Sequence, residues 1–192
     1  MSVPAILNKL GSRGHAVFTR GDYNLNIIGV RTPSRLANTF DDWMHVVFKQ
    51  DDEWKDLKFP ITTDPGLYWL EHPMRVEGTA ILCPGQYRGV YKLGKHRGKY
   101  LALVQTGGRV KVWRDNNKDE VLDHDPEAVA QGYFGINIHR SSTAKGGSRQ
   151  VEKYSAGCQV FQNPHDFDVF MSLCQRSAEK YGSTFTYTLV DW

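Results

Sequence analysis

The stretch from Gly135 to Phe161 reads GINIHRSSTAKGGSRQVEKYSAGCQVF. Apolar and polar residues alternate in its first positions, a period of two that is typical of a strand with one buried face. After a polar loop, the segment from Ser155 runs into Val160 and Phe161, which predicts a turn that leads into a second short strand. The stretch therefore indicates a β-rich fold in which a histidine ends one strand and a cysteine begins the next.

His139 and Cys158 are the two residues of this stretch that can carry chemistry. If the two strands are neighbours, the imidazole can take the thiol proton and the resulting thiolate can attack a carbonyl carbon. Gly157 precedes the cysteine, and a glycine there lets the backbone turn sharply and direct its amides toward a developing oxyanion. A single cysteine is more often a packing residue than a nucleophile. The combination at two strand ends is what points to a nucleophilic site.

These residues resemble the signature of the L,D-transpeptidase catalytic domain. Members of that family carry a strand-borne His followed by Ser/Thr-x-Gly-Cys, which His139 and the segment 155–158 match. The chain departs from the family pattern at two positions. Ala156 stands where His or Arg is common, and Val160 stands where Arg or Asn is usual. Both departures concern the anchoring of substrate more than the nucleophile.

The resemblance implies a role for each residue of the motif. Cys158 would be the nucleophile, and His139 would be the general base that later protonates the leaving amine. The backbone amides of Gly157 and Cys158 would form the oxyanion hole. Ser155 is expected to support the turn or to hydrogen-bond near the histidine, with support of the turn favoured.

The residues after His139 are candidates for positioning and substrate binding. In the family a backbone carbonyl commonly orients the imidazole, and Arg140, Ser141 or Ser142 could supply it here. The loop 141–153 contains glycines and cations, so it is either a solvated connection or a lid whose cations bind a substrate carboxylate. Because the usual Arg after the cysteine is missing, we assign substrate binding to Arg140, Ser141, Ser142 and Arg149.

Length and composition bound the class of protein. The chain has 192 residues, 12% of them aromatic, and a formal net charge of +3. This length predicts one domain over residues 1–192, which the resemblance implies is a catalytic domain. No run of Lys and Arg stands out in the sequence, so we do not expect nucleic acid as a partner. The first ten residues lack a basic region followed by an apolar run, so we expect no signal peptide. No segment has the roughly 20 apolar residues that a membrane-spanning helix needs, so we expect no membrane partner.

The three cysteines fit neither a complete set of disulfides nor a zinc site. Cys83 and Cys174 are expected to be packing residues, although a disulfide between them stays open. A metal-dependent peptidase is the main mechanistic rival, since seven histidines and the acidic cluster 123–125 supply possible ligands. However, no His-x-x-x-His or comparable spacing occurs. We therefore expect no metal and no cofactor.

The rest of the chain predicts mainly strands. Residues 2–10 are expected to form a short helix capped by Ser2, and an acidic turn at 50–53 separates the strands of a hairpin. One substantial helix is expected after the motif, with Asn163 as its N-cap and Gly182 after its end, followed by a final strand. Further strands are expected at 16–19, 25–30, 79–82, 89–93, 101–105, 109–114 and 120–122. We predict a β-sandwich or barrel with one substantial C-terminal helix, compatible with the L,D-transpeptidase fold.

The leading hypothesis is a monomeric cysteine acyl-transfer enzyme that acts on peptidoglycan stem peptides. An amine acceptor would make it an L,D-transpeptidase, and water would make it an L,D-carboxypeptidase or endopeptidase. The expected lack of an export signal favours a lytic protein that is made in the cytoplasm and reaches the periplasm or cell wall by release or injection, such as a phage endolysin or an effector. The alternative is a noncatalytic wall-binding or virion structural domain that keeps the fold. Alkylation of Cys158 well below the free-thiol pKa of about 8.5 would argue for catalysis.

Overall fold

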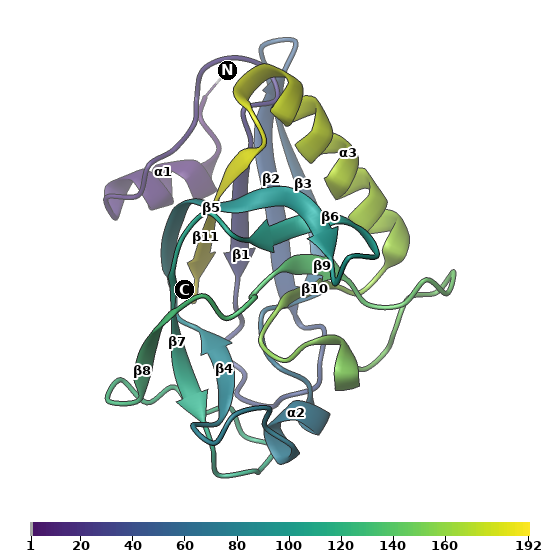
Figure 1. Ribbon diagram of the computed structural model, residues 1–192. Coiled ribbons are helices and arrows are strands. Elements are labelled where there is room, and N and C mark those ends of the chain that lie inside the picture. Colours follow the sequence, from purple (N-terminus) through teal and green to yellow (C-terminus); the bar gives the residue numbers. More distant parts are fainter. Residues whose placement is uncertain (1) are drawn as a thin grey trace.

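A closed β-barrel forms the body of the computed structural model, which describes residues 2–192 (Figure 1). The barrel strands are β1 (Asn26–Val30), β2 (Asp42–Gln50), β3 (Glu53–Thr62), β5 (Gly85–His96), β6 (Tyr100–Gln105), β9 (Ile138–Arg140), β10 (Gln159–Phe161) and β11 (Thr184–Val190). Their order around the barrel is β1-β11-β5-β6-β9-β10-β3-β2, and β2 pairs with β1 to close it. Two pairs, β1 with β11 and β9 with β10, are parallel, whereas the others are antiparallel. The mainly β fold that the sequence predicts is therefore present as a barrel.

A second, three-stranded antiparallel sheet lies at the lower end of the barrel in Figure 1. Its strands, in order, are β4 (Thr79–Leu82), β7 (Val110–Asp115) and β8 (Val129–Gly132). The helical elements are α1 (Ala5–Ser12), α2 (Leu67–Glu71), the 3-10 helix η1 (Glu152–Tyr154) and α3 (Pro164–Tyr181). None of the helices within residues 2–192 is long and apolar enough to cross a membrane.

The long helix α3 is the one that the sequence predicts after the motif. The Asn163 side chain caps it by accepting a hydrogen bond from the His165 amide, and Gly182, with φ of +86°, follows its end. Its apolar face packs on β9 and β10, where Phe167 and Phe170 contact the Phe161 ring. The helix thereby buttresses the two short strands that carry the candidate site.

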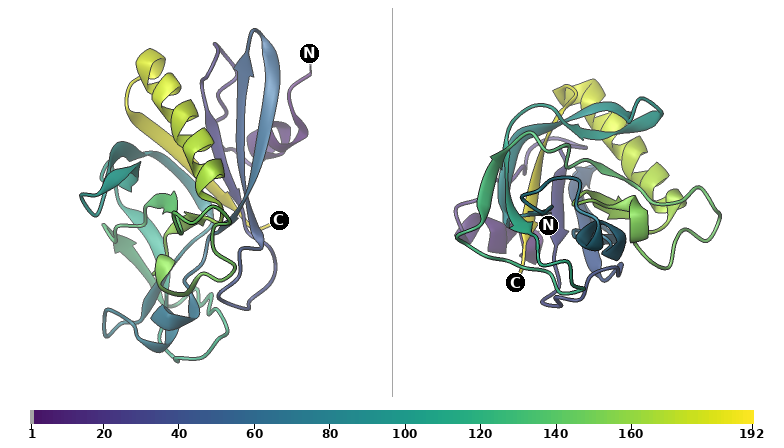
Figure 2. Two further views of the ribbon diagram at one scale, coloured as in Figure 1. Left: turned by 90° about the vertical axis from the view of Figure 1, so that its right-hand side faces the viewer. Right: turned by 60° about the horizontal axis from the view of Figure 1, so that its bottom comes forward.

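The outer face of β1, β2 and β11 is covered by α1. Leu7 and Leu10 of this helix pack against Ile28, Val47 and Val190 on the outside of β1, β2 and β11. Figure 2 shows α1 and α3 on opposite sides of the β1–β3 strands. Because residues that alternate with Ile28 and Val47 point into the main core, these strands bury side chains on both faces. Burial on both faces accounts for their nearly continuous apolar runs.

Three sequence-based expectations about local structure are wrong. The helix α1 has no side-chain cap, so Ser2 does not cap it. Residues 16–19 form no strand, because the Asn26 side chain takes up both the backbone amide and the carbonyl of Phe18. Residues 120–122 form only an isolated bridge, because the Asn117 and Asp119 side chains accept hydrogen bonds from backbone amides of this segment. The strand that pairs with β7 is β8 instead.

The strand that carries the histidine is also shorter than the pattern predicts. It begins only at Ile138 rather than at the start of the alternating segment. The side-chain oxygen of Gln105 accepts hydrogen bonds from the amides of Phe134 and Ile136, each at 3.1 Å. A side chain therefore replaces the neighbouring strand as hydrogen-bond partner along this segment.

Candidate active site

The strands β9 and β10 bring the predicted pair together. They lie side by side and parallel, with Val160 opposite His139, and Cys158 stands immediately before β10. The Gln159 amide donates to the Asn137 carbonyl at 2.9 Å, which joins the starts of the two strands. His139 and Cys158 both line a cavity of about 220 Å³. The condition under which the two residues can meet, that the motif strands are neighbours, is therefore met.

The hydrogen bonds of His139 determine its tautomer. Nδ1 lies 2.8 Å from the Arg140 carbonyl oxygen and 3.5 Å from the Tyr100 hydroxyl. Because a carbonyl oxygen can only accept, Nδ1 carries the proton and Nε2 keeps the lone pair that a general base needs. No residue within 2–192 hydrogen-bonds Nε2. Of the three carbonyls that the sequence left open, that of Arg140 orients the imidazole.

A second histidine, His96 at the end of β5, stacks on the first, and sequence reasoning missed it. The two rings lie 4.0 Å apart between centroids at an interplanar angle of 26°. The Asn137 side-chain amide donates to His96 Nδ1 at 3.1 Å, and its orientation is fixed because its oxygen accepts from the Gln105 amide at 2.9 Å. His96 Nε2 therefore carries the ring proton. No sequence pattern links this hairpin residue to the motif.

The environment of His139 keeps its ring neutral. Burial, with a smaller effect of the neighbouring His96, lowers the pKa of His139 to about 3, although the hydrogen bond to the Arg140 carbonyl opposes the shift. The His139 side chain is 3% exposed, so little water is present to solvate an imidazolium. The imidazolium form is therefore disfavoured at neutral pH.

The environment of Cys158 keeps its thiol protonated. Burial raises the pKa of Cys158 to about 11, although the backbone amide of Asn137 and the charge of Arg97 both lower it. The thiol donates to the Gly135 carbonyl oxygen at 3.4 Å. Cys158 is thus a neutral thiol that lines the same cavity as a neutral imidazole. With a neutral thiol at rest, Cys158 is not expected to be alkylated rapidly at mildly acidic pH.

We expect the alkylation of Cys158 by iodoacetamide to be no faster than that of glutathione at about pH 7. The alkylation rate should keep rising up to about pH 10, because the fraction of thiolate grows tenfold per pH unit below the thiol pKa. Mass spectrometry of the peptide that contains Cys158 measures this rate. A rate plateau already reached near pH 6 would show a thiolate–imidazolium pair and overturn this assignment.

Ser155 and Gly157 shape the turn that leads into Cys158. The buried Ser155 hydroxyl donates to the Cys158 carbonyl at 2.8 Å and accepts from the Gly157 amide at 3.1 Å. Gly157 has φ of +113°, and a Cβ at this position would lie 2.2 Å from the Ala80 carbonyl oxygen. Ser155 thus supports the turn, and only glycine fits at position 157.

The expected oxyanion hole is only partly available. The Gly157 amide already donates to the Ser155 hydroxyl, so assigning it to the oxyanion hole was wrong. The Cys158 amide, in contrast, donates to no acceptor within residues 2–192. This amide is therefore the backbone donor that can reach an oxyanion formed on a carbonyl carbon attacked by Cys158.

The four candidates for substrate binding differ in whether they line a cavity next to His139. Arg140 and Ser141 line a cavity of about 150 Å³ beside His139, but the Ser141 hydroxyl donates to a backbone carbonyl at 2.8 Å and serves the loop. Ser142 accepts from a backbone amide of the same loop, and Arg149 is exposed. Neither of these two lines the cavities that contain His139. Arg140 is thus the one candidate placed to contact a ligand there.

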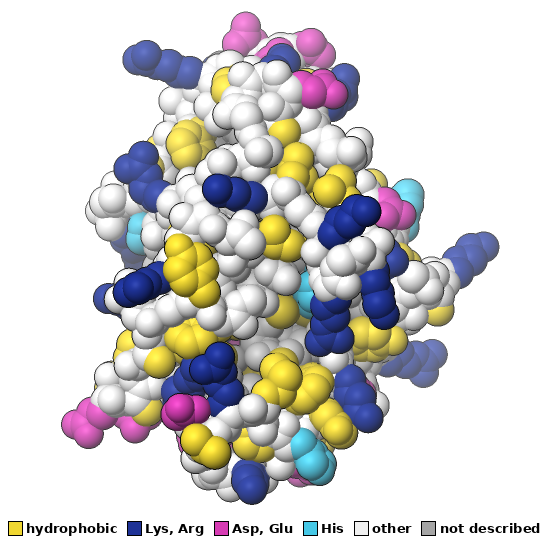
Figure 3. Space-filling model, viewed as in Figure 1, with side chains coloured by type: hydrophobic (Ala, Val, Ile, Leu, Met, Phe, Trp, Pro, Cys, Tyr) yellow, Lys and Arg dark blue, Asp and Glu magenta, His cyan; other side chains and the backbone are white. Residues whose placement is uncertain are grey.

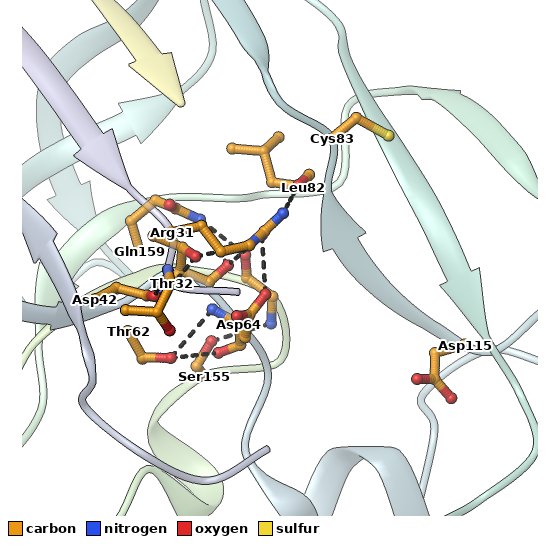
Figure 4. A network of polar contacts seen from close by, with 12 residues as sticks. Arg31, Thr32, Asp42, Thr62, Asp64, Leu82, Cys83, Asp115, Ser155 and Gln159 are labelled. Atoms are coloured by element: carbon orange, nitrogen blue, oxygen red, sulfur yellow. Dashed lines mark hydrogen bonds and ion pairs between the residues drawn. The ribbon is translucent and has the colours of Figure 1, made fainter. Parts of the chain in front are cut away.

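A buried polar network holds Gln159, the residue after the nucleophile (Figure 4). Gln159 donates to the Thr63 carbonyl at 3.3 Å and accepts from the Tyr187 hydroxyl at 2.7 Å. The same Thr63 carbonyl accepts from Arg31 at 3.1 Å, and Arg31 forms an ion pair with Asp64 at 2.8 Å. The position of Cys158 is therefore tied to a charged group in the barrel interior.

The remaining sequence candidates lie away from this site. Cys83 and Cys174 are buried free thiols, so the disulfide that the sequence left open does not form. His124 stacks on Trp113 at 4.3 Å between ring centroids, next to the second sheet. Within residues 2–192, no group of three His, Cys, Asp or Glu side chains is placed to hold a metal ion.

Comparison with known proteins adds no family to this description. No protein-family model matches the chain, and no curated protein matches its sequence. The geometry of Cys158 and His139 therefore has to carry the functional argument.

Proposed function

We propose that this protein is a cysteine acyl-transfer enzyme that acts on peptidoglycan stem peptides in the manner of an L,D-transpeptidase. The observation that carries the proposal is the placement on one cavity of a thiol and an imidazole whose Nε2 is unprotonated and free. Such a pair can accept and return one proton, which is what acyl transfer by a thiol requires. The substrate class rests on the resemblance of the motif around His139 and Cys158.

In the proposed reaction the cavity holds the carbonyl of an L-to-D peptide bond beside Cys158. As the sulfur attacks the carbonyl carbon, His139 Nε2 takes the thiol proton, and the oxyanion accepts a hydrogen bond from the Cys158 amide. The imidazolium, held through Nδ1 by the Arg140 carbonyl, then gives its proton to the leaving amine as the C–N bond breaks. The acyl-enzyme is released by an amine acceptor or by water.

The surface around the pair also suits an anionic peptide. Three cavities follow one another along this face, because each shares lining residues with the next. The nucleophile's cavity shares Phe134 and Ala156 with the first and His139 with the third. Several arginines and lysines line these cavities, and no Asp or Glu does. A stem peptide with free carboxylates would find complementary charge along the whole face.

A noncatalytic wall-binding or virion structural role is the second candidate. It is favoured by the raised pKa of Cys158 and by the hydrogen bond that its thiol gives to the Gly135 carbonyl. Both features are also those of an inert, buried thiol. The two candidates differ in whether any covalent change in a muropeptide depends on Cys158.

Mass spectrometry of purified muropeptides incubated with the protein, with and without a D-amino acid acceptor, tests the proposal. We expect loss or exchange of a residue in the wild type and none in a Cys158→Ala variant. A Cys83→Ala variant, which removes a distant thiol, should behave as the wild type. Loss of a residue identifies a hydrolase, and exchange identifies a transpeptidase. Unchanged muropeptides together with sedimentation of the protein on cell walls would instead support the wall-binding candidate.

A further inference from the structure

The cavity of about 150 Å³ beside His139 has a distinct chemical character. It adjoins the nucleophile's cavity through His96, Arg97 and His139, which line both, but Cys158 does not line it. Four cationic side chains surround it, and they come from the β5–β6 turn, the end of β9 and η1. These residues are Arg97, Lys99, Arg140 and Lys153.

The four cations have no protein counter-ions. Within residues 2–192, none of them lies within 4.0 Å of a carboxylate oxygen. Two of them are held by aromatic rings instead, with the Arg140 guanidinium 4.0 Å from the Tyr100 ring and the Lys153 ammonium 4.1 Å from the Tyr68 ring. Figure 3 shows Lys and Arg side chains gathered around the hollow over β9 and β10. Clustered, unneutralised cations in a cavity favour an anionic ligand.

His96 adds a neutral donor to the same place. Because its Nδ1 accepts from the Asn137 side chain, its proton is on Nε2. The ring is buried and lines both cavities, where it stacks on His139. Burial, with the charge of Arg97, lowers the pKa of His96 to about 4, so the ring stays a neutral donor at neutral pH.

We propose that this cavity binds the α-carboxylate of an amino acid whose amine takes part in the reaction. That amino acid is the residue released when the acyl-enzyme forms, or the acceptor that attacks the acyl-enzyme. The inference rests on the proposed function, in which His139 protonates the leaving amine and must therefore lie next to it. In any α-amino acid the carboxylate carbon is bonded to the same carbon as the amine. An amine at His139 thus brings its carboxylate to the adjoining cavity, where Arg97 and Arg140 can donate charge-assisted hydrogen bonds to it.

The subsite gives the enzyme a defined substrate class. A terminal residue offers a free carboxylate, whereas a residue inside a longer peptide or a cross-link has an amide at that position. An amide brings no charge and leaves the cations of the cavity unpaired. The protein should therefore release or exchange a C-terminal residue in preference to cleaving an internal bond.

Binding to the Cys158→Ala protein tests the subsite without turnover. The probes are a synthetic stem tetrapeptide with a C-terminal D-alanine and the same peptide as its C-terminal carboxamide, titrated by calorimetry. We expect the free acid to bind about 10- to 100-fold more tightly. An added Arg97→Asn substitution should remove most of that preference, since Asn tolerates the left-handed backbone at this position, where φ is +50°. An Arg88→Gln control, exposed on β5 and outside the cavity, should keep it.

The outcomes separate this inference from the proposed function. Equal affinity for the acid and the carboxamide overturns the subsite, whatever the wild type does with muropeptides. A preference for the acid that survives both Arg97→Asn and Arg140→Gln overturns the assignment to these cations. Tight binding of the acid by the Cys158→Ala protein, with no turnover by the wild type, supports the subsite and contradicts the proposed function.

Discussion

A His139→Gln variant is expected to turn over muropeptides about 10⁴-fold more slowly than the wild type at pH 7. Without the base, the reaction depends on thiolate that forms by itself. A thiol whose pKa is about 11 is ionised in about one molecule in 10⁴ at pH 7. The loss is therefore near the upper end of what general-base catalysis contributes. Steady-state kcat/KM by chromatography of the released residue measures it.

The pH dependence of the same variant distinguishes a missing base from a damaged fold. The sign follows from the thiol: raising the pH increases the thiolate fraction tenfold per unit until the pH nears the thiol pKa. The residual activity of the variant should rise correspondingly between about pH 7 and pH 10. A His165→Gln control changes an exposed histidine at the start of α3 and should match the wild type. A His139→Gln protein that keeps activity within tenfold of the wild type would remove His139 from the mechanism.

An Arg31→Met variant is expected to lower the free energy of unfolding by about 3–5 kcal/mol. Arg31 is 2% exposed, and its guanidinium donates to the Thr63 hydroxyl, the Thr63 carbonyl and the Leu82 carbonyl as well as pairing with Asp64. Methionine fills much of the volume but leaves the Asp64 carboxylate buried without a counter-ion. Denaturant unfolding at pH 8 measures the loss. A Lys49→Met control, which breaks a surface pair with Asp52, should change stability by under about 1 kcal/mol.

The loss in Arg31→Met should depend on pH in a defined direction. Burial raises the pKa of Asp64 to about 7, although the Arg31 guanidinium opposes the rise. Because this folded-state pKa lies above the unfolded value, the Asp64 contribution to stability is complete below about pH 4 and is lost as pH rises through about 7. At pH 5 the carboxyl is mostly protonated, so the variant and the wild type should differ less than at pH 8. A difference that is independent of pH would show that the ion pair is not the cause.

Local signals in the sequence predict the elements that depend on neighbouring residues. The cap of α3 by Asn163, the glycine after its end and the β2–β3 hairpin are all confirmed. Each of these depends on backbone preferences and hydrogen bonds within a few residues. The strand expected at 16–19 is wrong for the complementary reason. The Asn26 side chain satisfies that backbone from eight residues away, which no local pattern shows.

The candidate site also has one part that a local sequence pattern predicts and another part that depends on distant segments of the chain. The pattern around His139 and Cys158 predicts two short strands and leaves open whether they are neighbours, and the structure pairs them. His96 and Arg97 come from the β5–β6 hairpin and reach the site through the pairing of β6 with β9, which no sequence pattern indicates. The neutral charge state of the pair also depends on burial, which a motif does not encode.

The parallel pairing of β1 with β11 has a consequence for biosynthesis. The first barrel strand pairs with β2 early in the chain but lacks its second neighbour until residues 184–190 have been made, so the barrel stays open on a shorter chain. The Tyr187 hydroxyl, which anchors the residue after Cys158, arrives on the same last strand. A chain that stops before this strand therefore carries Cys158 on a turn that lacks one of its anchors.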